Sequence, residues 1–250
     1  AQQAEFGNIP IPDGDVTAEL VWQDEQGVIA DEGVTVVNAS ERERAYLQVR
    51  TAKEGNAVVA MKVNGEIYWS WHIWCTDYEP NVTEGQKFFN NLVWMDRNLG
   101  AMTNEYTIDG GVKGLFYQWG RKDPFPASEG WTDQEKMLYT LTGTTNLSYK
   151  EVDTSENLVE AIRQPARFLI AITSPGDWYT NSMSLLNRTL WLPNTKTIFD
   201  PCPVGWRVPG NQPWTGLLQG GLFYSYGLVH PDAGYFPCTG YRRPQTGRVD

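Results

Sequence analysis

The stretch AVVAMKVNGEIYWSWHIW, residues 57–74, decides the fold class of this chain. Its two halves, Ala57–Val63 and Glu66–Trp74, are rich in β-branched and aromatic residues, which favour strands. Asn64-Gly65 stands between them, and both residues tolerate the positive φ angles of a type I′ turn. The stretch therefore predicts a β-hairpin within a β-rich domain.

Shorter strand-like runs precede this hairpin. Residues 18–22 can form a strand, and residues 34–37 and 45–50 alternate with the two-residue period of strands. Several short strands at this spacing predict a small β-sandwich over residues 1–80. Residues 1–16 are expected to form an irregular lead-in.

The composition becomes polar between residues 77 and 86, and we place a domain boundary there. Residues 81–250 contain short apolar segments, many aromatic residues and frequent turns. This pattern predicts a mixed α+β domain with much irregular structure. The chain as a whole is therefore predicted to be β-rich α+β.

Two helices are predicted in the second domain. Residues 155–164 place three apolar side chains on one face, and Pro165 ends the helix. Residues 133–141 form the second, because Thr132 and Glu135 have the spacing of a capping box.

Charge and hydropathy exclude several partners. The 250 residues include 20 basic and 30 acidic side chains, so the net charge is −10. An acidic chain repels phosphate backbones, which argues against nucleic acid as a partner. No stretch approaches the roughly 18 apolar residues of a membrane span. Residues 1–5 lack the features of a signal peptide, so a cytosolic protein and an exported chain whose signal has been removed both remain open.

The cysteines and histidines give no pattern of a metal or catalytic site. The three cysteines, Cys75, Cys202 and Cys238, are far apart and form no C-x-x-C pair. In an oxidising compartment Cys202 and Cys238 can form a disulfide, and buried free thiols are the alternative. His72 and His230, the two histidines, neighbour no nucleophile motif. We therefore predict a protein that is not an enzyme and needs no cofactor.

One charged segment has two interpretations. Arg121-Lys122-Asp123-Pro124 can bind an anionic ligand. The alternative, which we favour, is that Asp123 shapes a turn before the proline and that Arg121 stacks or pairs internally.

The hairpin and the segments after it resemble a known family. The quoted run extends to GNAVVAMKVNGEIYWSWHIWCTDYEP and is similar to the last sandwich segment of fimbrillin-family proteins of Bacteroidetes. Later segments, in the same order, resemble the Fibrobacter succinogenes major paralogous domain that is often fused to it. They are VWMDRNLGA (93–101), GLFYQWGRKDPFP (114–126), IRQPARFL (162–169), KTIFDPCPVGWRVP (196–209) and FPCTGYR (236–242).

The resemblance implies a fold and a location. Residues 1–80 would be an immunoglobulin-like sandwich, and residues 81–250 a C-type-lectin-like domain, similar also to the formylglycine-generating enzyme. Such proteins are secreted or lie on the outer-membrane cell surface, some of them in fimbriae. The family usually continues beyond the equivalent of Asp250. We therefore expect that the last strands are missing or that another chain supplies them, as in strand donation.

Aromatic residues in turn-rich stretches are the candidate ligand contacts, because exposed rings bind sugar faces and loops carry binding function. The stretch from Trp214 to Tyr235 is the strongest, since lectin-like folds usually present their binding loops late in the domain. Core packing is the alternative for each ring, including Trp131 and Trp191. The predicted contacts are Trp178, Tyr179, Trp214, Tyr224, Tyr226 and Tyr235.

Three functions remain open at this stage. The leading hypothesis is a surface adhesion or pilus-associated protein that binds a glycan or protein ligand non-covalently, with a structural calcium left open. The second is a pilin-like structural subunit that contacts other pilus subunits. The third is a carbohydrate-active enzyme, which would need a cleft with paired carboxylates.

Overall fold

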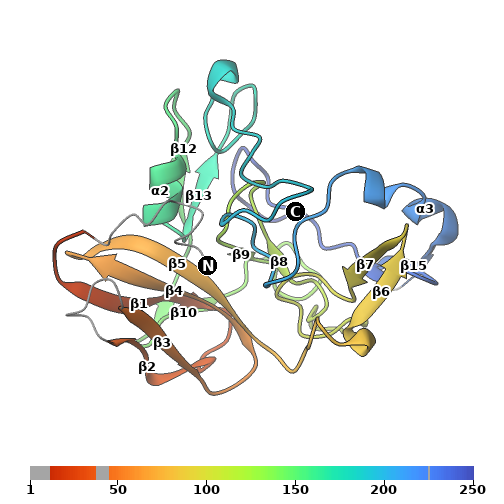
Figure 1. Cartoon of the computed structure of the whole chain (residues 1–250), viewed down its shortest axis with the longest axis horizontal. Coiled ribbons are helices and arrows are strands. Elements are labelled where there is room, and N and C mark those ends of the chain that lie inside the picture. The colour runs from red at the N-terminus through yellow and green to blue at the C-terminus, as the bar shows by residue number, and fades with distance from the viewer. Residues whose placement is uncertain (1–11, 38–44, 225) are drawn as a thin grey trace.

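The computed structural model describes residues 12–37, 45–224 and 226–250 (Figure 1). The predicted lead-in over residues 1–16 lies mostly outside these residues. The chain is β-rich, with few and short helices, and its strands form several small sheets. The first five strands are β1 (Val16–Gln23), β2 (Ile29–Val37), β3 (Tyr46–Thr51), β4 (Gly55–Val63) and β5 (Glu66–Cys75).

The hairpin between β4 and β5 is confirmed. Asn64 and Gly65 have φ angles of 51° and 82°, the left-handed values that a type I′ turn requires. The strands pair antiparallel up to Val63 and Glu66 on either side of the turn. The Asn64 side chain also accepts a hydrogen bond from the Asp15 N–H at 3.0 Å, which ties the turn to the start of β1.

Strand β4 lies inside a five-stranded sheet of order β11-β10-β1-β4-β5 and is buried on both faces. Val59 points to one core, which it shares with Leu20. Val58 points to a second core, which it shares with Trp22. Burial on both faces explains why the β4 sequence is almost continuously apolar rather than alternating.

The two-stranded sheet β2–β3 covers the first of these faces. Val34 of β2 and Leu47 and Val49 of β3 pack against the Leu20 and Val59 core. Two packed sheets are the arrangement expected for residues 1–80.

Residues from the second half of the chain cover the other face. Phe125 and Phe168 pack against Trp22 and Val58. The short strands β10 (Leu138–Tyr139) and β11 (Thr144–Thr145) extend the sheet beyond β1. The two predicted domains therefore share a core and a sheet, while the boundary between residues 77 and 86 stays a prediction.

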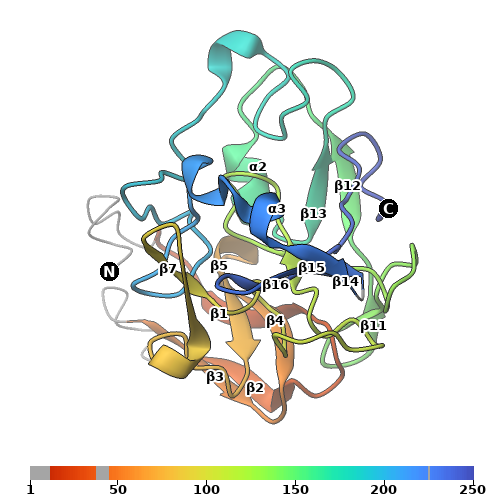
Figure 2. The ribbon, with the colours of Figure 1, turned by 90° about the vertical axis from the view of Figure 1, so that its right-hand side faces the viewer.

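The remaining strands form small pairs and one three-stranded sheet. Figure 1 shows β6, β7, β15 and α3 at the end of the molecule opposite β1–β5, and Figure 2 shows β14–β16 side by side. The strands are β6 (Gln86–Phe89), β7 (Leu92–Met95), β8 (Leu115–Phe116), β9 (Phe125–Pro126), β12 (Ser148–Glu151), β13 (Arg167–Ile170), β14 (Leu222–Tyr224), β15 (Gly227–His230) and β16 (Gly234–Pro237). The helices are α2 (Leu158–Arg163) and α3 (Leu217–Gly220), and the 3-10 turns are η2 (Thr83–Gly85), η3 (Met183–Leu185) and η4 (Gln212–Trp214).

One helix prediction is confirmed in shortened form and the other is wrong. Helix α2 begins after Asn157 rather than at residue 155, and Val159 faces solvent. Residues 133–141 contain β10 instead of a helix. The Thr132 hydroxyl donates to Glu129 and a bridge joins Ser128 to Glu135, so local bonds hold this segment in a turn.

Candidate functional site

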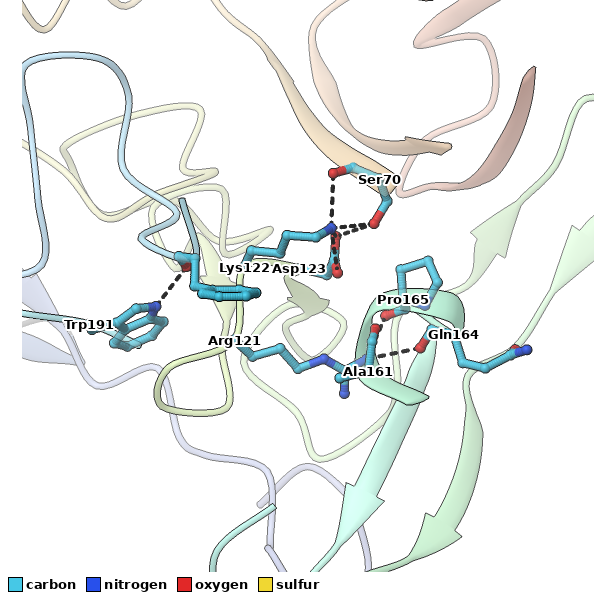
Figure 3. A network of polar contacts seen from close by, with 9 residues as sticks. Ser70, Arg121, Lys122, Asp123, Ala161, Gln164, Pro165 and Trp191 are labelled. Atoms are coloured by element: carbon cyan, nitrogen blue, oxygen red, sulfur yellow. Dashed lines mark hydrogen bonds and ion pairs between the residues drawn. The ribbon is translucent and has the colours of Figure 1, made fainter. Parts of the chain in front are cut away.

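A buried polar cluster joins β5 to the segment that begins at Arg121. The Lys122 ammonium lies 2.8 and 2.9 Å from the two Asp123 carboxylate oxygens and donates to the Ser70 carbonyl at 2.9 Å (Figure 3). The Ser70 hydroxyl donates to Asp123 at 2.7 Å. We call Ser70, Arg121, Lys122 and Asp123 the polar junction, and all four residues are buried.

Arg121 connects this junction to helix α2. Its guanidinium donates to the carbonyl oxygens of Ala161, Gln164 and Pro165 at 2.9–3.3 Å, at the C-terminal end of the helix. A further bond of 2.6 Å goes to the Arg167 carbonyl. Burial lowers the pKa of Arg121 to about 10, so the side chain stays charged at neutral pH. A positive charge at the C-terminal end of a helix interacts favourably with the helix dipole.

The junction supports the structural interpretation of this segment. Its charges pair with one another or with backbone carbonyls, and the adjoining cavity measures about 10 Å³, enough for about one water molecule. Burial also lowers the pKa of Lys122, against the opposing effect of Asp123. An anionic ligand therefore has no room here, and the junction holds the fold.

Two of the predicted ligand contacts lie in the core. Trp178 and Tyr179 are about 4–5% exposed and pack with Trp191 and Phe199. The Trp178 indole N–H donates to the Trp119 carbonyl at 2.6 Å. In this structure their rings present no face to a ligand.

Trp214 is partly exposed and joins two sheets. Its ring meets Trp94 of β7 edge-on at a centroid distance of 4.7 Å, and Phe236 of β16 at 6.0 Å. These contacts hold η4 against both sheets, so the ring has a packing role and a partly open surface.

The other three predicted contacts gather on the sheet β14–β16. Tyr224 ends β14 and Tyr226 lies in the turn before β15, and they are 72% and 63% exposed. The Tyr235 ring crosses over Gly227, where a Cβ would lie 2.3 Å from the ring. Glycine at this position therefore leaves room for the Tyr235 ring beside the turn that carries Tyr226.

Two more rings complete this surface. Tyr106 and Trp131 stack with each other and with Tyr226, at centroid distances of 5.1–6.0 Å and interplanar angles of 14–23°. We call Tyr106, Trp131, Tyr224, Tyr226 and Tyr235 the aromatic patch. Sequence reasoning considered Trp131 but did not select it, and it missed Tyr106. The signal available was that Tyr106 lies in a segment rich in Thr, Asn, Asp and Gly.

A shallow apolar pocket continues the patch along β14. It measures about 530 Å³ and includes Leu222, Tyr224, Val229 and Pro231 among its lining residues. Each side chain of β14 is exposed, which is unusual for a run of Leu, Phe and Tyr. The patch and the pocket together form the candidate binding surface.

The cysteines do not form the bridge that the sequence allowed. Cys75, Cys202 and Cys238 all lie within the described residues and are free thiols. Cys202 is held in its own loop, since its N–H donates to Asp200 and its carbonyl accepts from Lys196. Cys238 is exposed after β16, where its N–H donates to the Tyr226 carbonyl.

Among residues 12–37, 45–224 and 226–250, no group of three or more His, Cys, Asp or Glu side chains is placed to hold a metal ion. Within the described part of the chain, no helix has the length and apolar character to cross a membrane.

Comparison of the chain with protein-family models, with curated proteins and with solved structures finds no match.

Proposed function

We propose that the chain is a cell-surface adhesion protein that binds a glycan or protein ligand non-covalently at the aromatic patch. The observation that carries this proposal is the exposure of Tyr224 and Tyr226 beside the stacked rings of Tyr106 and Trp131. Aromatic rings normally bury their area in a core, and an exposed cluster of them is typical of a recognition surface.

The location and family are part of the same proposal. The ordered segments that resemble fimbrillin-family and major paralogous proteins support an exported protein on the outer surface or in fimbriae. They also support an immunoglobulin-like first domain and a C-type-lectin-like second domain. The packing of β2–β3 on the sheet of β1, β4 and β5 is compatible with the first of these.

The contacts of the histidines and of a buried carboxylate favour recognition over catalysis. His72 lies 3.0 Å from the Asn56 amide oxygen, and the ring of His230 accepts from the backbone N–H groups of Asp232 and Ala233. Both histidines are thus engaged in structural contacts. The buried carboxylate Asp123 is likewise paired with Lys122.

Binding of the purified chain to a glycan array and to a panel of host surface proteins, with and without calcium, tests the proposal. We expect specific ligands that are lost when Tyr224 and Tyr226 are both replaced by Ala. Tyr46→Ala is the matched control, because Tyr46 is 61% exposed on β3, far from the patch. No specific ligand on either panel, or equal binding by all three proteins, would contradict the proposal.

A second candidate function is a structural subunit that assembles by strand addition. Within the described residues, β14 pairs only with β15, so it is an edge strand with three exposed apolar side chains. Such edges accept a strand from another chain. Filaments or concentration-dependent oligomers, abolished by Phe223→Pro, would favour this function, and a monomer at every concentration would oppose it.

A further inference from the structure

Three rings of the aromatic patch, Tyr106, Trp131 and Tyr226, stack closely on one another. A ring sandwiched between two others would place the outer centroids roughly 7 Å apart, since each stacking contact needs about 3.5 Å. The longest centroid distance in the cluster, between Tyr106 and Tyr226, is only 6.0 Å. No ring is therefore enclosed by the other two. All three pairs are stacked, and Tyr106 and Tyr226 are the most nearly parallel pair at 14°.

Trp131 is a fixed base for these two rings. Its indole N–H donates to the Thr107 carbonyl at 2.8 Å. The Lys113 ammonium lies 5.4 Å from the indole centroid and donates to the Gly130 carbonyl at 2.8 Å and to the Ser128 hydroxyl. The lysine is buried and its charge is used in holding the indole.

Tyr226 occupies a backbone position that disfavours tyrosine. Its φ angle is 56°, in the left-handed region where Gly and Asn fit at lower cost. The Cys238 N–H donates to its carbonyl at 2.7 Å and locks this conformation. A ring that is 63% exposed is thus kept at a strained turn, and such strain is concentrated at functional positions.

The segment that carries Tyr106 is acidic. Residues 103–111, which carry Tyr106, include Glu105 and Asp109 and no basic residue. Both acidic side chains are exposed. Carboxylates repel an anionic ligand and accept hydrogen bonds from hydroxyl groups.

From this geometry we propose that Tyr106 and Tyr226, supported by Trp131, bind one neutral hexopyranose unit of a glycan by stacking against its apolar face. This inference rests on the proposed function and names its ligand class. Nearly parallel rings that are 38% and 63% exposed suit the C–H face of a sugar, whereas recognition of an extended peptide uses a groove. The exposed carboxylates beside Tyr106 disfavour sialylated or sulfated sugars.

Isothermal titration with neutral hexasaccharides of glucose, mannose and galactose, and with sialylated glycans, tests the inference. We expect at least one neutral series to bind, and affinity to fall about tenfold or more in Tyr106→Ala and in Tyr226→Asn. Tyr226→Asn removes the ring but suits the left-handed backbone, and thermal unfolding of this variant separates a loss of binding from a loss of folding. The distant Tyr46→Ala is expected to bind as the unchanged chain does.

The outcomes separate this inference from the proposed function. Glycan binding that survives both ring substitutions would overturn the stacking site and leave the adhesion proposal standing. Binding of host proteins but of no glycan, or a preference for sialylated glycans, would overturn the ligand class alone. Binding of neither class on any panel would contradict both proposals.

Discussion

The polar junction and the aromatic patch both depart from the usual distribution of side chains between the core and the surface. Charged side chains normally face solvent and aromatic rings normally fill cores. In the junction Arg121, Lys122 and Asp123 are buried, and in the patch Tyr224 and Tyr226 are exposed. The difference lies in the partners: the buried charges pair with one another or with backbone carbonyls, while the exposed tyrosine side chains keep most of their surface in solvent. Burial of paired charges supports a structural role, and the exposure of the rings is the basis of the recognition that we propose.

Asp123→Ala should have the largest effect of any single change considered. It leaves the Lys122 ammonium buried without its carboxylate, and breaking a buried ion pair in this way costs about 3–5 kcal/mol of unfolding free energy. Urea denaturation measures the change. Lys53→Ala, which removes an exposed ion pair with Glu25, should have little effect. Equal losses in the two variants would show that the junction is not structural.

Arg121→Met should have the second-largest effect on the unfolding free energy. Methionine keeps the aliphatic bulk but leaves the carbonyls of Ala161, Gln164 and Pro165 without their donor, at a cost of about 2–4 kcal/mol. Thermal unfolding followed by circular dichroism measures it. Arg188→Met is the control, since Arg188 is exposed. A melting temperature unchanged in Arg121→Met would refute its role at the end of α2.

His72 should give stability a pH dependence. Burial lowers its pKa from 6.5 to about 4, although Asp123 acts in the opposite direction. The unfolded chain binds a proton near pH 6.5 and the folded chain only near pH 4, so stability falls as pH falls through this window. Relative to the His72→Gln variant, the unchanged chain should lose roughly 2 kcal/mol of unfolding free energy between pH 6.5 and pH 4. Parallel pH profiles from urea denaturation of the two proteins would contradict this.

The cysteine thiols should react with an alkylating reagent at different rates. This difference is not expected to change the unfolding free energy of the chain. Cys238 is exposed, whereas burial raises the pKa of the Cys202 thiol and leaves little thiolate. Iodoacetamide at pH 8, followed by mass spectrometry, should label Cys238 well before Cys202. In urea all three cysteines should react. A pair that stays unlabelled until a reductant is added would instead indicate a disulfide.

Local signals predicted the β-rich class and the β4–β5 hairpin, whereas contacts between distant segments could not be predicted from them. Asn64-Gly65 specifies its own turn, so the β4–β5 hairpin could be predicted from neighbouring residues alone. The pairing of Gln23 with Tyr139, and of Ser70 with Lys122, depends on segments that meet only in space. The capping-box pattern at Thr132 failed because tertiary and turn contacts outweighed the weak helix preference.

Only part of the candidate site could be predicted, because some of its residues are neighbours in sequence and others meet only in space. Tyr224, Tyr226 and Tyr235 share one short sheet, so the sequence could group them. Trp178 and Tyr179 lie in an equally turn-rich stretch, and composition cannot distinguish a buried ring from an exposed one. Tyr106 was missed because its contact with Tyr226 joins distant parts of the chain.

We propose that the aromatic patch recognises a ligand and that the polar junction holds the fold. Measurements of glycan and protein binding, and of unfolding free energy, on the unchanged chain and on the variant with Tyr224 and Tyr226 both replaced by Ala test both roles. We predict that binding falls about tenfold or more, while the chain stays folded and its unfolding free energy falls by no more than about 3 kcal/mol, the loss expected from two ring contacts. Unchanged binding, or a loss of binding that only follows a loss of folding, would contradict the account.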